Sequence, residues 1–154
     1  MKKILVSECL YGGRTVRYDG GDVHETNPIF LKWKDEGRLV PICPEVFGGL
    51  PIPRPDSQRI GDLVKTGAGV DVTEPYTRGA NEALRLAKEN DVAFAVMKQD
   101  SPSCGSKFIY DGTFTDTKKE GQGLAVEYLR NAGFLVFGEE DIDEAAAYLE
   151  ELEQ

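Results

Sequence analysis

The feature that most constrains the fold is a regular alternation of short apolar runs with segments of helical pattern. The apolar runs cover residues 3–7, 38–42, 91–97 and 134–137, and helical signals cover residues 28–37, 73–90, 121–132 and 141–153. Strands that alternate with helices are joined by right-handed crossovers and form a sheet with helices on both faces. We therefore expect an α/β fold of the doubly wound, Rossmann-like type. We expect a mostly parallel sheet and a single domain over residues 1–154.

Local signals refine this scheme. Asn27 and Pro28 are a typical N-cap and first helical residue, and Trp33 is expected to face the core. Pro41 argues against a central strand, because proline cannot donate to a β-ladder. The terminal helix is expected to turn four apolar residues inward, namely Ile142, Ala145, Leu149 and Leu152.

Two segments predict loops or hairpins. Residues 44–72 are rich in Pro and Gly, which indicates a long loop carrying one short hairpin. Asp111 and Gly112 lie inside the run 108–115 and predict a hairpin with a two-residue turn.

Charge and hydropathy exclude several classes of protein. A formal net charge of −9 over 154 residues argues against a nucleic-acid polymer as the main partner, although a free base or nucleotide in a local pocket remains compatible. The longest apolar runs are the size of strands, so no membrane span is expected. Glu8 interrupts the first apolar run too early for a signal peptide, and we expect a cytoplasmic protein. No pattern indicates the oligomeric state.

Three cysteines each follow a predicted strand: Cys9, Cys43 and Cys104. The carboxyl ends of parallel strands share one edge of the sheet, and ligands bind there in open α/β folds. Thiolates are soft ligands for zinc, cuprous copper or iron–sulfur clusters. Three ligands without an obvious fourth favour a centre with one open position. The sequence therefore predicts one shared site, although a single buried cysteine is also compatible with a purely structural role.

Seven motifs appear in a fixed order along the chain. They are VSECL (6–10), RYDG (17–20), CPEV (43–46), GGLPIPRP (48–55), SPSCG (101–105), IYDGTF (109–114) and GQG (121–123). With these motifs the chain closely resembles the bacterial family of thiouracil desulfidases, which was once catalogued only as a domain of unknown function. The resemblance extends from about residue 3 to residue 139.

This resemblance implies a cofactor and an activity. It implies a [4Fe-4S] cluster bound by three cysteines, which map onto Cys9, Cys43 and Cys104, with one iron open to the substrate sulfur. It implies a catalytic glutamate and a catalytic serine, which map onto Glu45 and Ser101. The implied reaction is a non-redox desulfuration of a thiolated pyrimidine, such as 2- or 4-thiouracil or a related nucleoside or nucleotide. It yields the oxo form and hydrosulfide.

Further residues are candidates for the substrate side of the site. Ser103, Arg17 and Asp19 are candidate substrate-binding residues, although an internal Arg17–Asp19 ion pair is equally compatible with the RYDG motif. Arg54 lies between two prolines, which suggests a deliberately placed charge. The segment DSQ (56–58) departs from the Pro-Ala-Glu that the family more often has, and it is expected to line the substrate side.

Two other functions compete with the desulfidase. A non-enzymatic iron–sulfur or zinc protein, such as a sensor or a sulfur carrier, would bind metal without removing sulfur from any base. A nucleotide-binding module with incidental cysteines is less favoured, because no G-x-G-x-x-G follows the first strand and no Walker loop is present. Redox-active dithiol chemistry lacks the close cysteine pair that it uses.

Overall fold

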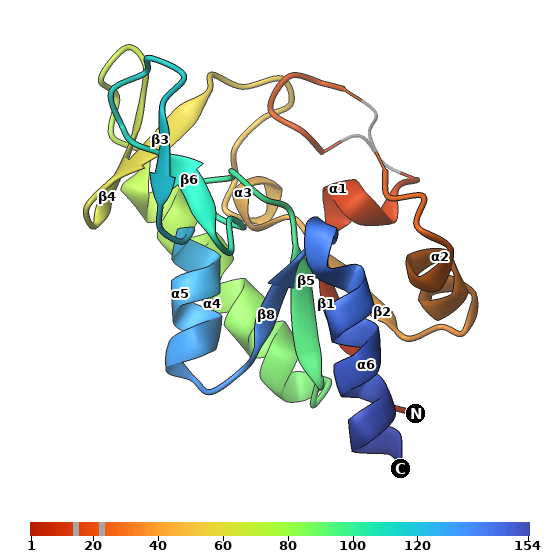
Figure 1. The fold of residues 1–154 in the computed structure, drawn as a ribbon. Helices are drawn as coiled ribbons and strands as arrows, with labels where there is room; N and C mark the ends of the chain where they lie inside the picture. The colour runs from red at the N-terminus through yellow and green to blue at the C-terminus, as the bar shows by residue number, and fades with distance from the viewer. Residues whose placement is uncertain (14–15, 22–23) are drawn as a thin grey trace.

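The computed structural model describes residues 1–13, 16–21 and 24–154 and is built around a four-stranded sheet (Figure 1). The strand order is β2-β1-β5-β8, and every neighbouring pair is parallel. The strands are β1 (Ile4–Ser7), β2 (Leu39–Ile42), β5 (Phe94–Met97) and β8 (Val136–Gly138). The predicted α/β class and parallel sheet are confirmed.

Helices cover both faces of this sheet. On one face α4 (Thr73–Glu89) and α5 (Leu124–Asn131) pack against Leu5, Ala95 and Met97. On the other face α2 (Pro28–Asp35) and α6 (Ile142–Glu153) pack against strand residues that include Phe94. Because helices cover both faces of the sheet, the strands are mostly apolar rather than alternating. No helix in the described part of the chain has the length and apolar character needed to cross a lipid bilayer.

The order of the strands creates a switch point at the centre of the sheet. The chain passes from β1 to β2 on one side and then returns to β5 on the other side of β1. At such a point the two crossovers diverge and leave a crevice at the carboxyl ends of the strands. Pro41 lies in β2, which is an edge strand, so the donor that proline lacks breaks no central ladder.

Two short helices follow the first two strands, and the second of them corrects the prediction that a loop begins at residue 44. Helix α1 (Glu8–Tyr11) follows β1, and α3 (Pro44–Phe47) follows β2. Four residues are too few to display a helical period. In the structure Cys43 is extended at the N-cap position of α3, and Pro44 occupies its first turn. Pro44 is therefore the local sequence signal for the start of this helix.

Two hairpins lie beside the sheet, with β3, β4 and β6 at the upper left of Figure 1. The hairpin expected in residues 44–72 is confirmed as β3 (Ser57–Ile60) and β4 (Leu63–Thr66). In the second hairpin, β6 (Phe108–Tyr110) pairs with β7 (Lys118–Glu120). The predicted two-residue turn at Asp111 and Gly112 is wrong, because residues 111–117 form the connection. The Asp111 carboxylate accepts hydrogen bonds from the amide and the hydroxyl of Thr113, which stabilises a wider loop.

The terminal helix follows its predicted pattern with one exception. A short 3₁₀ turn, η1 (Glu139–Asp141), precedes α6, in which Ile142, Ala145 and Leu149 are buried. Leu152 was expected inside but is 37% exposed. It lies on the last turn, beyond Leu149, which is the final α6 residue in that core.

Candidate functional site

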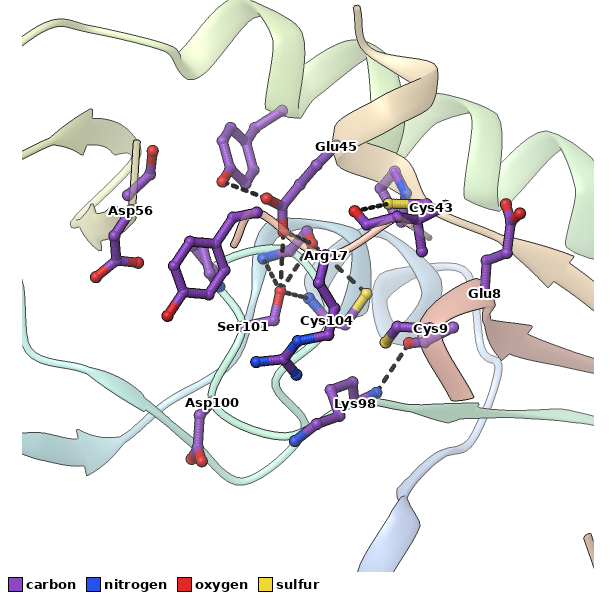
Figure 2. A pocket seen from close by; sticks show the side chains of 18 of the residues that line it. Glu8, Cys9, Arg17, Cys43, Glu45, Asp56, Lys98, Asp100, Ser101 and Cys104 are labelled. Atoms are coloured by element: carbon purple, nitrogen blue, oxygen red, sulfur yellow. Dashed lines mark hydrogen bonds between the residues drawn. The ribbon is translucent and has the colours of Figure 1, made fainter. Parts of the chain in front are cut away.

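A cavity of about 260 Å³ lies at the carboxyl ends of β1, β2 and β5. All three cysteines line it, together with Glu45, Ser101, Ser103 and Arg17 (Figure 2). The convergence predicted from the strand order is therefore present. Because the elements that carry the cysteines are far apart in the sequence, only the parallel sheet brings them together.

Each cysteine is placed by a different element. Cys9 lies on α1 directly after β1, and Cys43 is the residue before α3. Cys104 lies in the loop that follows β5. The amides of Leu124 and Ala125, at the start of α5, donate to carbonyls of this loop at 2.9 and 3.0 Å. The free amides of a helix N-terminus thus hold the Cys104 loop in place.

The three thiols are free; Cys104 is buried, whereas Cys9 and Cys43 are half-buried. Burial, with a contribution from the nearby Cys43, raises the pKa of Cys9 to about 12. Burial also raises the pKa values of Cys43 and Cys104. Redox-active thiols have lowered pKa values instead, so this environment does not match dithiol chemistry. A bound cation deprotonates coordinating thiols outright.

The three cysteines can be compared with the ligands that a single metal ion and an iron–sulfur cluster each need. Within residues 1–13, 16–21 and 24–154, no three Cys, His, Asp or Glu side chains come close enough to hold one metal ion. A zinc ion would need all its sulfur ligands at about 2.3 Å from one point. An iron–sulfur cluster instead binds each thiolate at a different iron, so its ligands are spread around it. The three cysteines that line this cavity are soft donors of the kind that iron–sulfur clusters use.

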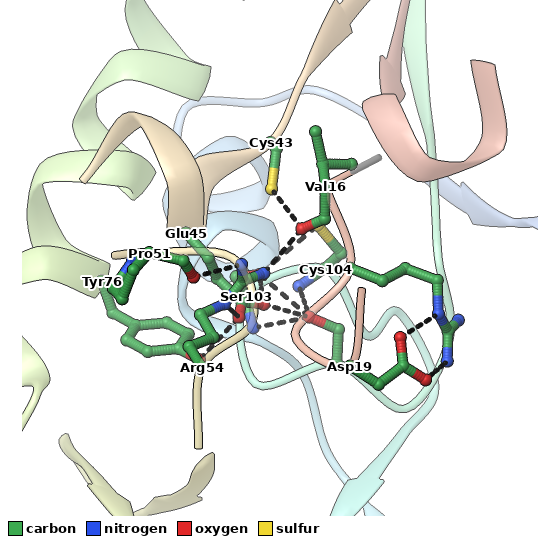
Figure 3. Close-up of polar contacts among 11 residues, drawn as sticks. Val16, Asp19, Cys43, Glu45, Pro51, Arg54, Tyr76, Ser103 and Cys104 are labelled. Atoms are coloured by element: carbon green, nitrogen blue, oxygen red, sulfur yellow. Dashed lines mark hydrogen bonds and ion pairs between the residues drawn. The ribbon is translucent and has the colours of Figure 1, made fainter. Parts of the chain in front are cut away.

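The carboxylate of Glu45 accepts hydrogen bonds from four side chains of the cavity (Figure 3). Its Oε1 accepts from Arg54 Nε at 3.1 Å and from the Tyr76 hydroxyl at 2.9 Å. Its Oε2 lies 3.2 Å from Ser101 Oγ and 3.0 Å from Ser103 Oγ. The two carboxylate oxygens therefore face different groups: Oε1 faces the protein interior and Oε2 faces the two serines.

Ser101 has a fixed hydrogen-bonding role. Its Oγ accepts from the backbone amides of Ser103 and Cys104, both at 3.1 Å. Because these amides occupy the acceptor side of the oxygen, the hydroxyl of Ser101 acts as a donor, with Glu45 Oε2 at 3.2 Å and Ser103 Oγ at 2.9 Å as its two acceptors within reach. Ser103 Oγ also lies 3.5 Å from the sulfur of Cys104, so the serine pair links the carboxylate to the thiol.

Two residues that support Glu45 were not assigned to the site from the sequence. Arg54 was noted as a placed charge, and its side chain is 4% exposed in the ion pair with Glu45. Its Nη2 donates to the Val16 carbonyl at 2.9 Å, so it also ties down the segment that carries Arg17. Tyr76 gave no polar signal, because an aromatic residue in a helix usually belongs to the core. Burial and the charge of Glu45 raise the pKa of Tyr76, so its hydroxyl stays a donor.

Arg17 and Asp19 form the internal ion pair that the RYDG motif allowed, with Arg17 Nε at 3.3 Å from Asp19 Oδ1. Arg17 lines the cavity, whereas Asp19 is not among its lining residues. Asp19 Oδ1 also accepts from the Gly21 amide at 2.8 Å, so its contacts orient Arg17 and the turn. Lys98 is a further cation on the cavity wall that the sequence did not predict, and it pairs with Glu139 at 3.1 Å.

The segment that carries Cys43 and Glu45 is pressed against α4 by two glycines. A Cβ on Gly79 would lie 1.9 Å from the Pro44 carbonyl oxygen, and one on Gly48 would lie 2.0 Å from the Pro75 carbonyl oxygen. Both positions therefore need glycine, because no side chain fits between the two backbones. This contact sets how deeply α3 sits in the site.

The fold and the cavity define a class: a doubly wound α/β protein with three thiols and a hydrogen-bonded carboxylate at the switch point of its sheet. The chain belongs to the 2-thiouracil desulfurase family, whose model matches residues 4–141.

Two relatives agree with this family. The chain is 39% identical over 151 residues to the uncharacterized protein YbbK of Bacillus subtilis (strain 168), with 92% of this chain and 98% of YbbK covered. Its fold matches the solved structure of the [4Fe-4S]-dependent thiouracil desulfidase TudS with a TM-score of 0.95 and 43% identity. That match covers 97% of this chain and 99% of TudS.

Proposed function

We propose that this protein is an iron–sulfur enzyme that removes sulfur from a thiolated pyrimidine by hydrolysis, without net redox change. The substrate would be 2- or 4-thiouracil or a related nucleoside or nucleotide, and the product would be the oxo form. The observation that carries the proposal is the lining of one cavity by three cysteines together with Glu45 and Ser101. Family membership and the likeness to TudS support the same reaction.

Cys9, Cys43 and Cys104 would hold a [4Fe-4S] cluster and leave one iron without a protein ligand. When bound, the cluster would supply a Lewis-acidic iron that polarises the carbon–sulfur bond of the substrate. Cysteine thiolates are the usual ligands of such clusters, and three of them would leave one iron for the substrate. Residues of the chain itself would carry out the proton transfer and orient the reactants.

Glu45 would act as the general base that takes a proton from the attacking water. The oxygen of water forms the new bond to the ring carbon, and the carbon–sulfur bond breaks with both electrons leaving on sulfur. The balance is one thiocarbonyl and one water giving one carbonyl, one hydrosulfide and one proton. Oε2 of Glu45 is suited to this proton, because Oε1 is paired with the Arg54 cation and the Tyr76 hydroxyl, whereas Oε2 contacts only the two neutral serine hydroxyls.

The serines and Arg17 would orient the reactants. Ser101 Oγ is held by two backbone amides and adjoins Glu45 Oε2, so it can position the water between carboxylate and ring. Ser103 would contact the substrate beside the thiol of Cys104. Arg17, oriented by Asp19, would place a positive charge over the same cavity and assist departure of the anionic sulfur.

The test is anaerobic reconstitution with iron and sulfide, followed by iron quantification and turnover of 2- and 4-thiouracil. We expect about four irons per chain, loss of iron in each Cys→Ser variant, and release of hydrosulfide with the wild-type protein. Glu45→Gln should keep its iron and lose turnover, while Glu150→Gln on the exposed face of α6 should change neither. Full turnover by Glu45→Gln would refute its role. Bound iron without turnover of any thiolated base would favour the sensor or carrier instead.

A further inference from the structure

The loop that carries Cys104 is closed by a buried glutamine that the proposed chemistry does not use. The loop connects β5 to β6, and three of the proposed site residues lie on it, namely Ser101, Ser103 and Cys104. Gln99 lies near the start of this loop and Ser106 near its end, and they are 5% and 4% exposed. Their side chains meet inside the protein, where they are hydrogen-bonded to each other.

The side-chain amide of Gln99 uses both of its polar atoms in this contact. Its Oε1 accepts from the backbone amides of Ser106 and Lys107 at 3.3 and 3.2 Å, and its Nε2 donates to Ser106 Oγ at 2.6 Å. Only the oxygen of the amide can accept from two N–H groups, so these partners also fix its orientation. The three hydrogen bonds, which we call the clasp, join residues seven and eight positions apart and hold the two ends of the loop together.

Burial makes the clasp important for the position of the loop. Where water is excluded, a donor or acceptor that loses its partner stays unsatisfied, which costs more than the loss of an exposed hydrogen bond. Ser106 is itself held in place, because its carbonyl accepts from Arg130 Nη1 of α5 at 2.8 Å. Gln99 therefore ties the start of the loop to a point that α5 fixes.

The end of β8 supports the clasp from outside the cavity. Glu139 Oε2, directly after β8, accepts from the backbone amide of Gln99 at 2.8 Å. Gly138 leaves the space that the side-chain amide occupies: a Cβ there would lie 2.3 Å from Gln99 Nε2 and 3.0 Å from Ser106 Oγ. None of the three residues of β8 lines the cavity. This edge strand therefore contributes to the site by holding the loop.

From these contacts we infer that Gln99 is a positioning residue that keeps Cys104 at the cavity wall, and that Gly138 provides the space it needs. Gln99 acts through the loop and takes no part in the reaction itself. Its effect on the cofactor rests on the proposed function, in which Cys104 binds the cluster. Its effect on the loop does not, so the two can be measured separately.

The first measurement uses the full-length protein before iron is added. Gln99→Ala removes the clasp, so hydrogen exchange in the peptide at the end of the loop should become about tenfold faster, the factor expected for the loss of two buried hydrogen bonds. Cys104 is buried and reacts with iodoacetamide when the loop opens, so its alkylation should accelerate by a similar factor. Peptide mapping should show the other two cysteines reacting as in wild type, whereas a general loss of stability would expose all three thiols together.

Gly138→Ala tests the same contact without removing the glutamine. Residue 138 has a φ of −90°, which alanine adopts without strain. The nearest atoms that its methyl group would meet belong to the side chains of Gln99 and Ser106, so the substitution displaces the clasp. It should accelerate alkylation of Cys104 as Gln99→Ala does, and combining the two substitutions should add little, because both remove one contact.

Gln58→Ala is the matched control. Gln58 is 4% exposed, and its Oε1 accepts from the backbone amides of Gly112 and Phe114 at 3.0 and 3.3 Å. It thus holds a loop in the same way as Gln99, but that loop carries no cysteine, and Gln58 does not line the cavity. The substitution should accelerate hydrogen exchange in its own loop and leave the reactivity of Cys104 unchanged.

The second measurement follows the release of iron to a chelator after anaerobic reconstitution. Release should be about tenfold faster from Gln99→Ala and Gly138→Ala than from wild type, and unchanged in Gln58→Ala. Wild-type reactivity of Cys104 in both clasp variants would overturn the assignment of Gln99, and a reactive Cys104 with unchanged iron release would overturn its link to the cofactor. If the wild-type protein binds no iron while the clasp variants still expose Cys104 selectively, the cluster is refuted and the clasp is retained.

Discussion

The contact between α3 and α4 leads to a prediction about Gly79. In an exposed helix Ala is favoured over Gly by about 1 kcal/mol, and Gly79 lies inside the 17-residue helix α4. Here the added methyl group would lie 1.9 Å from the carbonyl oxygen and 2.5 Å from the carbonyl carbon of Pro44. Both are backbone atoms, so no side-chain rotation relieves the clash. The substitution Gly79→Ala should therefore destabilise the protein.

The magnitude follows from two opposing effects. Overpacking a close-packed site costs about 1–3 kcal/mol, and a clash with backbone at this distance belongs at the upper end. Subtracting the helix-propensity gain of about 1 kcal/mol leaves a net loss of about 2 kcal/mol in the free energy of unfolding. For a chain of this size that loss lowers Tm by about 4–8 °C. Since Pro44 must move, Cys43 and Glu45 move with it, and iron content and turnover should fall as well.

Thermal unfolding followed by circular dichroism measures the stability, and iron quantification after reconstitution measures the site. Gly67→Ala is the matched control, because its added methyl group would make an ordinary contact of 3.5 Å with the Phe114 ring. The control should retain its Tm and iron. A Gly79→Ala protein as stable as wild type, with its full iron content, would refute the argument that this contact sets the depth of α3.

Three further predictions concern the carboxylate network and the opposite face of the sheet. Tyr76→Phe removes one donor to Glu45 Oε1. A hydrogen bond to a charged group is worth about 1.5–3 kcal/mol, so we expect kcat to fall at least tenfold with KM little changed. An unchanged kcat would contradict this prediction. Arg54→Lys cannot reproduce the simultaneous contacts with Glu45 and the Val16 carbonyl, so urea unfolding should show a loss of about 2 kcal/mol together with reduced turnover. Trp33→Ala empties a buried site against Phe94 on the far face of the sheet; it should cost about 3–5 kcal/mol while the protein that remains folded keeps its kcat.

Much of the fold was readable from the sequence because its signals are local and repeated. Four apolar runs alternate with helical patterns, and each appears as a strand of the parallel sheet. The predictions of secondary structure failed where only a few residues determine the local conformation. Helices α1 and α3 are too short for any periodicity, and the Asp111 loop follows from side-chain hydrogen bonds rather than from a dipeptide preference.

The sequence by itself therefore determined the α/β class, the three cysteines behind three strands, and the presence of Glu45 and Ser101 in motifs. Only the tertiary structure decided that Arg54 and Tyr76 hold one carboxylate oxygen while two serines face the other. It also decided that Arg17 is paired with Asp19. The physical reason is that the hydrophobic pattern around a residue in the sequence indicates whether its side chain is buried. Its hydrogen-bond and charge partners come from segments far away in sequence, and folding alone brings them within reach.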